Sequence, residues 1–210
     1  MSGDTAETMR KTICIQGNIG SGKSTLVRHL EEAQSASDKY VCMQEPVNVW
    51  SEYQMNGKNI LEKFYEDRKA YAFPFQMMAF YTRLKAMRAL PTDRTVIMER
   101  SVDTDKRIFA QMMIDDGSID PICARIYNEW FTDLAEDKTL NIVNVYIRTP
   151  PTVCHQRVNK RGRSGEEGIT LEYLQRCHDL HDSWLMGNSY VIDGTLPTSA
   201  IMEKVTRLLN

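Results

Sequence analysis

Short apolar, β-branched runs alternate along this chain with longer stretches whose apolar positions recur at helical spacing. The apolar runs cover residues 11–16, 40–44, 95–98, 140–147 and 189–193. Such alternation is typical of a parallel β-sheet wrapped by helices, because each parallel connection crosses back over the sheet. The pattern therefore predicts an α/β fold with a five-stranded parallel sheet flanked by helices.

A long helical region, roughly residues 57–90, is predicted between the second and third strands. Pro74 cannot continue a helix from within, so we expect a break there, with Pro74 in the first turn of a new helix. A helix that is apolar on most sides is buried on more than one face, against the sheet and against further core or a partner subunit. The apolar positions of the new helix are Phe75, Met77, Met78, Phe80, Tyr81, Leu84 and Met87.

The first predicted strand runs directly into a complete G-x-x-x-x-G-K-S phosphate-binding loop. Its glycines let backbone N–H groups point at the β- and γ-phosphates, and Lys23 adds a mobile positive charge. The Ser24 hydroxyl can ligate Mg²⁺, and the helix that follows presents its N-terminus to the phosphates. The alternative is a glycine-rich turn without a ligand. The predicted triphosphate site comprises Gly17, Asn18, Ile19, Gly20, Ser21, Gly22, Lys23, Ser24 and Thr25.

Composition adds mainly exclusions. With 210 residues, 42% hydrophobic and 26% charged, the chain can form one core, and a single domain over residues 11–210 is predicted. Residues 1–10 read as a disordered lead-in without the apolar segment of a signal peptide. A formal charge of −2 gives no general attraction to nucleic acid, and no apolar run reaches membrane-spanning length. Five widely spaced cysteines indicate reduced thiols and therefore a cytoplasmic protein. From the charge and the lack of a long apolar run, we expect no nucleic-acid or membrane partner.

Charged residues follow the second and third predicted strands. Glu45 comes directly after one, and Glu99 and Arg100 come directly after the other. Ligands of open α/β sheets bind beyond the carboxyl ends of the strands, where the phosphate loop also begins. Three separate segments are therefore expected to converge on one crevice.

An ordered set of short strings accompanies the phosphate loop. These strings are Glu45-Pro46-Val47, Pro-Phe-Gln at 74–76, Glu99-Arg100-Ser101, the arginine-rich 157–163 and Leu-Glu-Tyr-Leu at 171–174. In this order and spacing, from about Ile13 onward, the chain resembles the deoxynucleoside kinase family. The resemblance implies a P-loop kinase fold with an arginine-rich lid and, usually, a homodimer.

The reaction implied by the resemblance is transfer of the γ-phosphoryl group of ATP to the 5′-hydroxyl of a deoxynucleoside. Ser24 and Glu99 would hold Mg²⁺, and Glu45 would orient and deprotonate the hydroxyl, with Arg100 bonded to Glu45 and to the 5′-oxygen. Glu99 is the rival base, but its place beside the metal favours Glu45. Because the transition state is loose, a carboxylate of ordinary pKa is expected to suffice.

The lid combines basic residues with a possible sugar-binding acid. Arg157 and Arg161 share one helix face, and Arg163 follows the Gly162 break, so all three are expected to close on the donor phosphates; a solvated face or a nuclear localisation patch is the alternative. Glycines at 162, 165 and 168 supply hinges for that closure. Glu166 matches the family's acceptor for the 3′-hydroxyl, with Tyr65 as its partner and Glu167 as the alternative if the lid register differs. Gly165 stands where relatives often carry another acidic residue.

The base site is expected on the second helix of the 57–90 region. Gln76 can pair with a base edge, and Phe75, Trp50 and Phe109 can wall a flat ring. Arg83 lies two turns after Gln76 on the same face. Asp105 matches the aspartate that deoxycytidine and deoxyguanosine kinases place beside such an arginine. We therefore expect deoxycytidine and purine deoxynucleosides to be preferred over thymidine.

Two other functions share parts of this pattern. A nucleoside monophosphate kinase, such as thymidylate kinase, has a phosphate loop and lid but needs positive charge for the acceptor's phosphate, and Glu45 opposes it. A kinase-like subunit without activity usually loses the loop lysine or the base, whereas Lys23, Glu45 and Arg100 are all present. An active deoxynucleoside kinase remains the favoured interpretation.

Overall fold

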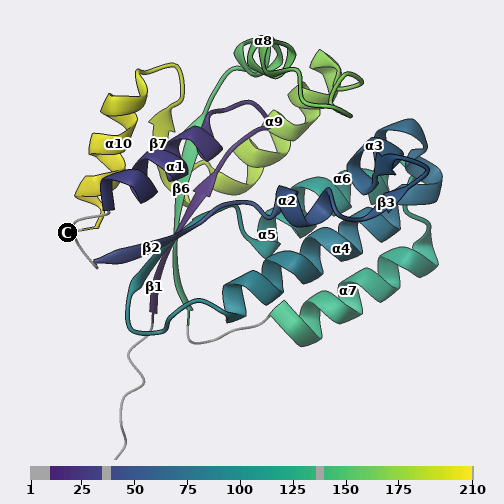
Figure 1. Cartoon of the computed structure of the whole chain (residues 1–210), viewed down its shortest axis with the longest axis horizontal. Coiled ribbons are helices and arrows are strands. Elements are labelled where there is room, and N and C mark those ends of the chain that lie inside the picture. The colour runs from purple at the N-terminus through teal and green to yellow at the C-terminus, as the bar shows by residue number, and fades with distance from the viewer. Residues whose placement is uncertain (1–9, 35–38, 136–139, 210) are drawn as a thin grey trace, which may run out of the picture.

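The computed structural model describes residues 10–34, 39–135 and 140–209. Five parallel strands form one sheet in the order β2-β5-β1-β6-β7, which confirms the predicted fold (Figure 1). β1 therefore lies at the centre, between β5 and β6. The strands are β1 (Arg10–Gln16), β2 (Tyr40–Met43), β5 (Thr95–Glu99), β6 (Leu140–Arg148) and β7 (Tyr190–Asp193).

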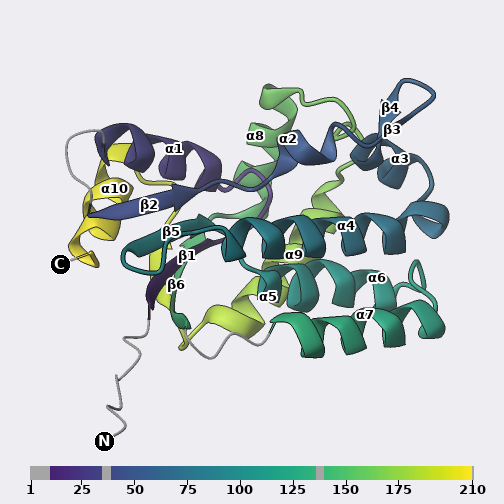
Figure 2. The same ribbon diagram turned by 60° about the horizontal axis from the view of Figure 1, so that its bottom comes forward.

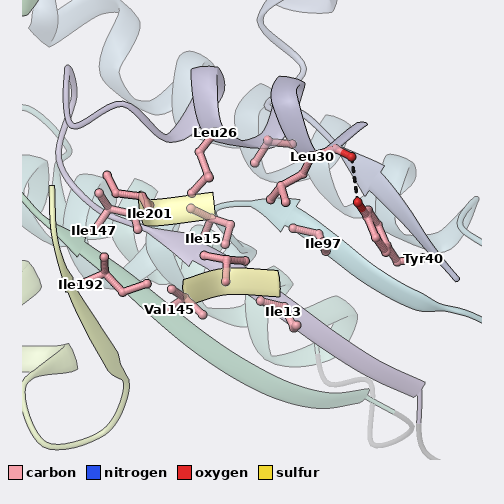
Figure 3. Close-up of a cluster of buried hydrophobic side chains, with 12 residues drawn as sticks. Ile13, Ile15, Leu26, Leu30, Tyr40, Ile97, Val145, Ile147, Ile192 and Ile201 are labelled. Carbon is pink, nitrogen blue, oxygen red and sulfur yellow. Dashed lines mark hydrogen bonds between the residues drawn. The ribbon is translucent and has the colours of Figure 1, made fainter. Parts of the chain in front are cut away.

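One face of the sheet is covered by α1 (Lys23–Gln34) and α10 (Thr198–Arg207). Alternate strand residues point to this face, as the pleat requires, so Ile13 and Ile15 pack here while Cys14 faces the other way. Figure 3 shows the resulting cluster of isoleucine, valine and leucine side chains, with the Tyr40 hydroxyl donating to the carbonyl of Leu30 at 2.8 Å. Burial on both faces explains why the strands read as continuous apolar runs.

The other face carries α4 (Arg68–Arg88), α5 (Val102–Thr104), α7 (Pro121–Ala135) and α9 (Leu171–Leu185). α4 packs its Phe80 and Leu84 against the strands, and α7 lies alongside α4 (Figure 1). In the view of Figure 2, α7 forms the lower edge of the molecule. The remaining elements are α2 (Val47–Trp50), the hairpin β3 (Gln54–Met55) and β4 (Lys58–Asn59), α3 (Ile60–Glu66), the π-helical segment η1 (Asp105–Ala110), α6 (Gln111–Asp115) and α8 (Pro151–Arg161).

The predicted helix break at Pro74 is wrong. The break lies at Asp67, whose carboxylate caps α4 by accepting from the backbone N–H of Ala70 at 3.1 Å. Pro74 lies inside α4, where it removes a single backbone bond, the one that would reach the carbonyl of Ala70. The buried neighbours Ala72 and Phe75 hold this turn of the helix in the core, and their packing offsets that loss.

The sequence prediction places Arg10 in a disordered lead-in, which is wrong for this residue. Arg10 already belongs to β1, and residues 1–9 lie outside the described residues. Within the part of the chain that the structure describes, no helix combines the length and apolarity that a membrane span requires.

Candidate active site

Two cavities open at the carboxyl end of the sheet. One, of about 470 Å³, extends from the phosphate loop between α2, α3, α4 and η1. The other, of about 570 Å³, lies over the phosphate loop and reaches the turn after β7. The two cavities meet, because the same six residues border both: Gly20, Lys23, Ser24, Gln44, Arg161 and Arg163.

The phosphate loop has the conformation that its glycines permit. Gly17 and Gly20 adopt φ angles of 143° and 78°, and a Cβ at either would lie within 2.7 Å of a backbone carbonyl oxygen. The side-chain amide of Asn18 donates to the carbonyl of Leu174 at 2.8 Å, which anchors the loop to α9. Gly17 and Asn18 border neither cavity, so these two predicted nucleotide-binding residues shape the loop instead.

Lys23 is buried at the junction of the two cavities. Its Nζ donates to the carbonyl of Asn18 at 2.7 Å and is 3.5 Å from the hydroxyl of Ser21. Burial, and next the charge of Arg100, lower the pKa of Lys23 to about 7. An anion arriving at the loop would therefore meet an ammonium group that exchanges its proton near neutral pH.

Ser24 and Glu99 face each other across the junction. The Ser24 hydroxyl donates to Oε1 of Glu99 at 2.7 Å. A hydroxyl and a carboxylate are oxygen ligands of the kind Mg²⁺ takes together with water and substrate phosphates, so the pair fits that cation. Among the described residues, no three His, Cys, Asp or Glu side chains converge as a complete metal cage.

Glu45 is clamped by two arginines. Nη1 of Arg100 donates to both of its carboxylate oxygens at 2.7 Å, and Nη2 of Arg83 donates to Oε1 at 2.7 Å. Burial by itself raises the pKa of Glu45, but the charges of Arg100, Arg83 and Lys23 outweigh it and lower the pKa to about 2. The pKa of Glu45 is therefore lower than the ordinary carboxylate pKa expected from the sequence, because two arginines and Lys23 surround it.

Arg100 reaches Glu45 from an unusual backbone conformation. Its φ of 62° lies in the left-handed region, which is uncommon for a residue with a side chain and often marks functional sites. Its N–H donates to the carbonyl of Ile15 at 3.0 Å, which continues the pairing of β1 with β5. The Arg100 guanidinium also lies over the ring of Phe109, 4.9 Å from the ring centroid.

Aromatic rings form one part of the wall of the first cavity. Phe75 stacks on Phe64 with centroids 5.0 Å apart, and the ring of Trp50 meets Phe75 edge-on at 5.5 Å. Gln76 is buried here, and its Oε1 has no hydrogen-bond partner among the described residues. A buried amide oxygen without a partner in a cavity of this kind is available to a ligand.

Asp105 borders the same cavity and begins η1, a single π-helical stretch of the type that often occurs at functional sites. Arg83 holds it with two hydrogen bonds, Nε to Oδ2 at 2.7 Å and Nη2 to Oδ1 at 3.2 Å. Arg83 itself is fully buried and does not border the cavity. The pairing of Arg83 with Asp105 is confirmed. The prediction that Arg83 itself binds the substrate is wrong, because its buried guanidinium reaches the cavity only through Asp105 and Glu45, to which it is hydrogen-bonded.

The lid following α8 forms a charged cluster of its own. Glu166 accepts from Nη2 of Arg161 at 2.6 Å and from Nη1 of Arg163 at 3.4 Å. Glu166 is buried and borders the first cavity, whereas Glu167 is exposed, so the lid register that favours Glu166 is the one observed. Tyr65 borders the same cavity.

Arg157 lies apart from that cluster, in the second cavity. Its guanidinium donates to the backbone carbonyls of Ser21 and Gly194 at 3.3 and 3.1 Å. These bonds join the phosphate loop to the turn after β7. Arg157 therefore braces the loop at the wall of the second cavity, while Arg161 and Arg163 stand at the junction.

The structure thus brings together nearly all of the predicted site residues, and it adds several that the sequence reasoning missed. Tyr173 could have been found, because it belongs to the Leu-Glu-Tyr-Leu string that marks the resemblance. Gln44, which borders both cavities, directly precedes Glu45 and carried no separate signal. The residues added to the first cavity include Gln44, Leu61, Phe64, Met113 and Tyr173, and those added to the second include Arg28 and Leu196.

Comparison with known proteins agrees with this geometry. A family model described as deoxynucleoside kinase matches residues 13–208. The chain is 39% identical to a probable deoxycytidine kinase of Fowlpox virus (strain NVSL), covering 85% of this chain and 73% of the relative. It is 34% identical to deoxycytidine kinase 2 of Gallus gallus (87% and 77% covered) and 33% identical to mitochondrial thymidine kinase 2 of Homo sapiens (86% and 66% covered). The chain therefore belongs to the deoxynucleoside kinase family of ATP-dependent phosphotransferases.

Proposed function

We propose that this kinase phosphorylates the 5′-hydroxyl of deoxycytidine and purine deoxynucleosides in preference to thymidine. The observation that carries the proposal is the Asp105 carboxylate, fixed by Arg83 at the wall of the aromatic cavity. A carboxylate accepts hydrogen bonds only, so it favours a base with an exocyclic amino group. Thymine instead presents a carbonyl oxygen and a methyl group at that edge, and both are unfavourable beside a buried negative charge.

The aromatic cavity would hold the nucleoside, and the cavity over the phosphate loop would hold ATP. Their junction then brings the 5′-hydroxyl to Glu45 and the γ-phosphoryl group to Lys23. Such alignment is the main requirement of phosphoryl transfer. Glu45 accepts the hydrogen bond of the hydroxyl and takes up its proton late, as suits a carboxylate with so low a pKa, while Arg100 keeps it oriented.

Ser24 and Glu99 would hold Mg²⁺, which neutralises charge on the donor phosphates when bound. Arg161 and Arg163, which stand at the junction, would share their charge between the phosphates and Glu166. Glu166 and Tyr65, which border the same cavity, would bind the 3′-hydroxyl together. A negative Glu45 at the acceptor position disfavours an acceptor that already carries a 5′-phosphate.

We also propose a homodimer that forms through α7 and α4. Apolar side chains at i, i+4, i+8 and i+12 of α7 make one exposed stripe, in which Ile122 is 74% and Trp130 is 52% exposed. Tyr81 of the neighbouring α4 is 55% exposed. A contiguous apolar stripe of this kind is typical of a protein interface. The cytoplasmic location expected from the sequence stays a prediction.

Steady-state kinetics with the four deoxynucleosides tests the substrate proposal. The expected result is a higher kcat/KM for deoxycytidine, deoxyadenosine and deoxyguanosine than for thymidine, because only these three carry an amino group on the base. A higher kcat/KM for thymidine than for deoxycytidine would overturn it. Nucleoside 5′-monophosphates, used as acceptors in the same assay, are expected to give no product.

A further inference from the structure

Gln16 is the last residue of β1 and is fully buried, yet it borders neither cavity. Its side-chain amide makes three hydrogen bonds to two other elements. Nε2 donates to the hydroxyl of Ser101 at 3.2 Å and to Oδ1 of Asn144 at 3.0 Å, and Oε1 accepts from the hydroxyl of Thr104 at 2.6 Å. The amide therefore joins the central strand to the start of α5 and to β6.

The two hydroxyl partners belong to the turn that carries Arg100. Ser101 caps α5, and its backbone N–H donates to the hydroxyl of Thr104 at 3.1 Å. Arg100, directly before this cap, has the left-handed φ of 62°. Its N–H is bonded to the carbonyl of Ile15, the neighbour of Gln16. Arg100 is thus held by Ile15 on one side and, through Ser101, by Gln16 on the other.

The backbone of Gln16 leads directly into Gly17, the first residue of the phosphate loop. We propose that Gln16 is a positioning residue, which fixes the turn bearing Glu99 and Arg100 relative to the phosphate loop. The inference rests on the proposed roles of those two residues. Lys23 and Ser24 depend on the loop, and the clamp on Glu45 depends on the turn. A small shift between the two would misalign the hydroxyl with the phosphoryl group, to which phosphoryl transfer is sensitive.

The chemistry of the partners determines which substitutions keep this link. Methionine fills a similar volume but leaves the hydroxyls of Ser101 and Thr104 and the side-chain Oδ1 of Asn144 without Gln16 as their partner. Glutamate keeps the shape, and burial without a neighbouring cation holds it in the protonated form. Its carbonyl oxygen can then accept from the Thr104 hydroxyl, and its O–H can donate to Oδ1 of Asn144. Gln16→Met should therefore release the turn, and Gln16→Glu should retain it.

Thr12 offers a matched control on the same strand and the same face. It is buried like Gln16, but its hydroxyl has no hydrogen-bond partner among the described residues. Thr12→Val removes a buried polar group from β1 without breaking a link to α5. Any general effect of making this strand face apolar will appear in both variants, whereas a positioning effect will appear only in Gln16→Met.

The experiment measures kcat, and KM for deoxycytidine and for ATP, in Gln16→Met, Gln16→Glu and Thr12→Val, with folding checked by thermal melting. We expect Gln16→Met to lower kcat by about ten- to a hundredfold, with both KM values changed less than threefold. Gln16→Glu should keep kcat within about threefold of the unsubstituted protein, because it retains the link. Thr12→Val should leave kcat unchanged.

An unchanged kcat in folded Gln16→Met would overturn the inference, as would an equal loss of kcat in Gln16→Glu. If Gln16→Met does not fold, Thr104→Val breaks the same link from α5 and must show the same fall in kcat. Arg100→Ala separates this inference from the proposed function. Full activity in Arg100→Ala would refute the role of Arg100 itself, whereas inactive Arg100→Ala beside active Gln16→Met refutes only the role of Gln16.

Discussion

Arg100 and Glu45 form a symmetric contact in which one guanidinium nitrogen lies 2.7 Å from both carboxylate oxygens. The contact fixes the plane of the carboxylate and removes any need for it to reorient when a hydroxyl arrives. It also lowers the basicity of Glu45, whose pKa falls to about 2. Orientation is thus obtained at the expense of proton affinity, which suits a reaction in which the proton moves late.

Glu45→Gln should lower kcat by about 10²- to 10⁴-fold, the range typical of a lost proton acceptor, while KM for ATP changes little. The amide keeps the shape of the side chain but can neither accept the proton nor pair fully with two arginines. Glu52→Gln, at an exposed position, serves as the control. A near-normal kcat in Glu45→Gln would contradict this role of Glu45 and would indicate that Glu99 is the base.

ATP binding should take up a proton above neutral pH. Lys23 has a pKa of about 7 in the unliganded protein, and phosphates favour its charged form. Below pH 7 the ammonium is already present, whereas above pH 7 binding must protonate it, so the affinity for ATP falls by up to about tenfold per pH unit. Calorimetry at pH 8, in buffers of different ionisation enthalpy, measures the proton directly. Lys23→Arg, whose charge does not titrate, should abolish the uptake.

Arg83→Met combined with Asp105→Ala should shift the kcat/KM ratio toward thymidine by about tenfold or more. Removing both partners together avoids leaving one charge buried alone. The shortened residue also leaves space where the thymine methyl group would lie. Competition between deoxycytidine and thymidine in one reaction measures the ratio directly. A ratio identical to that of the unsubstituted enzyme would mean that the ion pair serves stability only.

Gly165→Ala should weaken nucleoside binding through the lid. Gly165 has a φ of 87°, and a Cβ there would lie 2.9 Å from Cγ of Glu62, which also accepts a hydrogen bond from Ser164. Strain on the order of 1 kcal/mol would raise KM for the nucleoside about fivefold. Gly168→Ala is the matched control, because a Cβ there meets nothing within 4 Å. Equal KM values in the two variants would show that the lid does not depend on this contact.

Trp130→Glu should convert the proposed dimer into a monomer, because it places a charge in the centre of the exposed stripe on α7. Size-exclusion chromatography with light scattering gives the mass of each form. Glu129→Gln, the neighbouring exposed residue, controls for general surface changes. A dimer that persists in Trp130→Glu would show that the subunits meet elsewhere.

Much of the fold could be predicted because local rules and tertiary packing agree. The strands are buried on both faces, and the phosphate loop has few conformations compatible with its glycines. Pro74 shows where local reasoning fails, because its cost inside α4 is one backbone bond and the packing of Ala72 and Phe75 offsets it. The sequence shows that Pro74 must lose a backbone hydrogen bond, but it does not show the tertiary packing that offsets the loss.

The site residues could be predicted from the resemblance to a known family more than from the spacing of residues along the chain. Helical spacing correctly placed Arg83 on the same face of α4 as Gln76. It could not show that Asp105 would lie between the arginine and the cavity. Likewise, the attachment of Arg161 and Arg163 to Glu166 depends on the path of the loop after Gly162, which no periodic pattern encodes. The low pKa of Glu45 results from the charges of Arg100 and Arg83. The sequence could not show it, because both arginines lie far from Glu45 along the chain.

The complete burial of Arg83 has a bearing on how relatives of this enzyme diverge. The side chain that a base would touch and the arginine that holds it in place lie on different elements, η1 and α4. Only the first of the two borders the cavity. A list of the residues that border the cavity would include Asp105 but leave out Arg83. Changes in selectivity within the family are therefore best sought as paired exchanges, in which a hidden position on the long helix alters together with its partner at the wall.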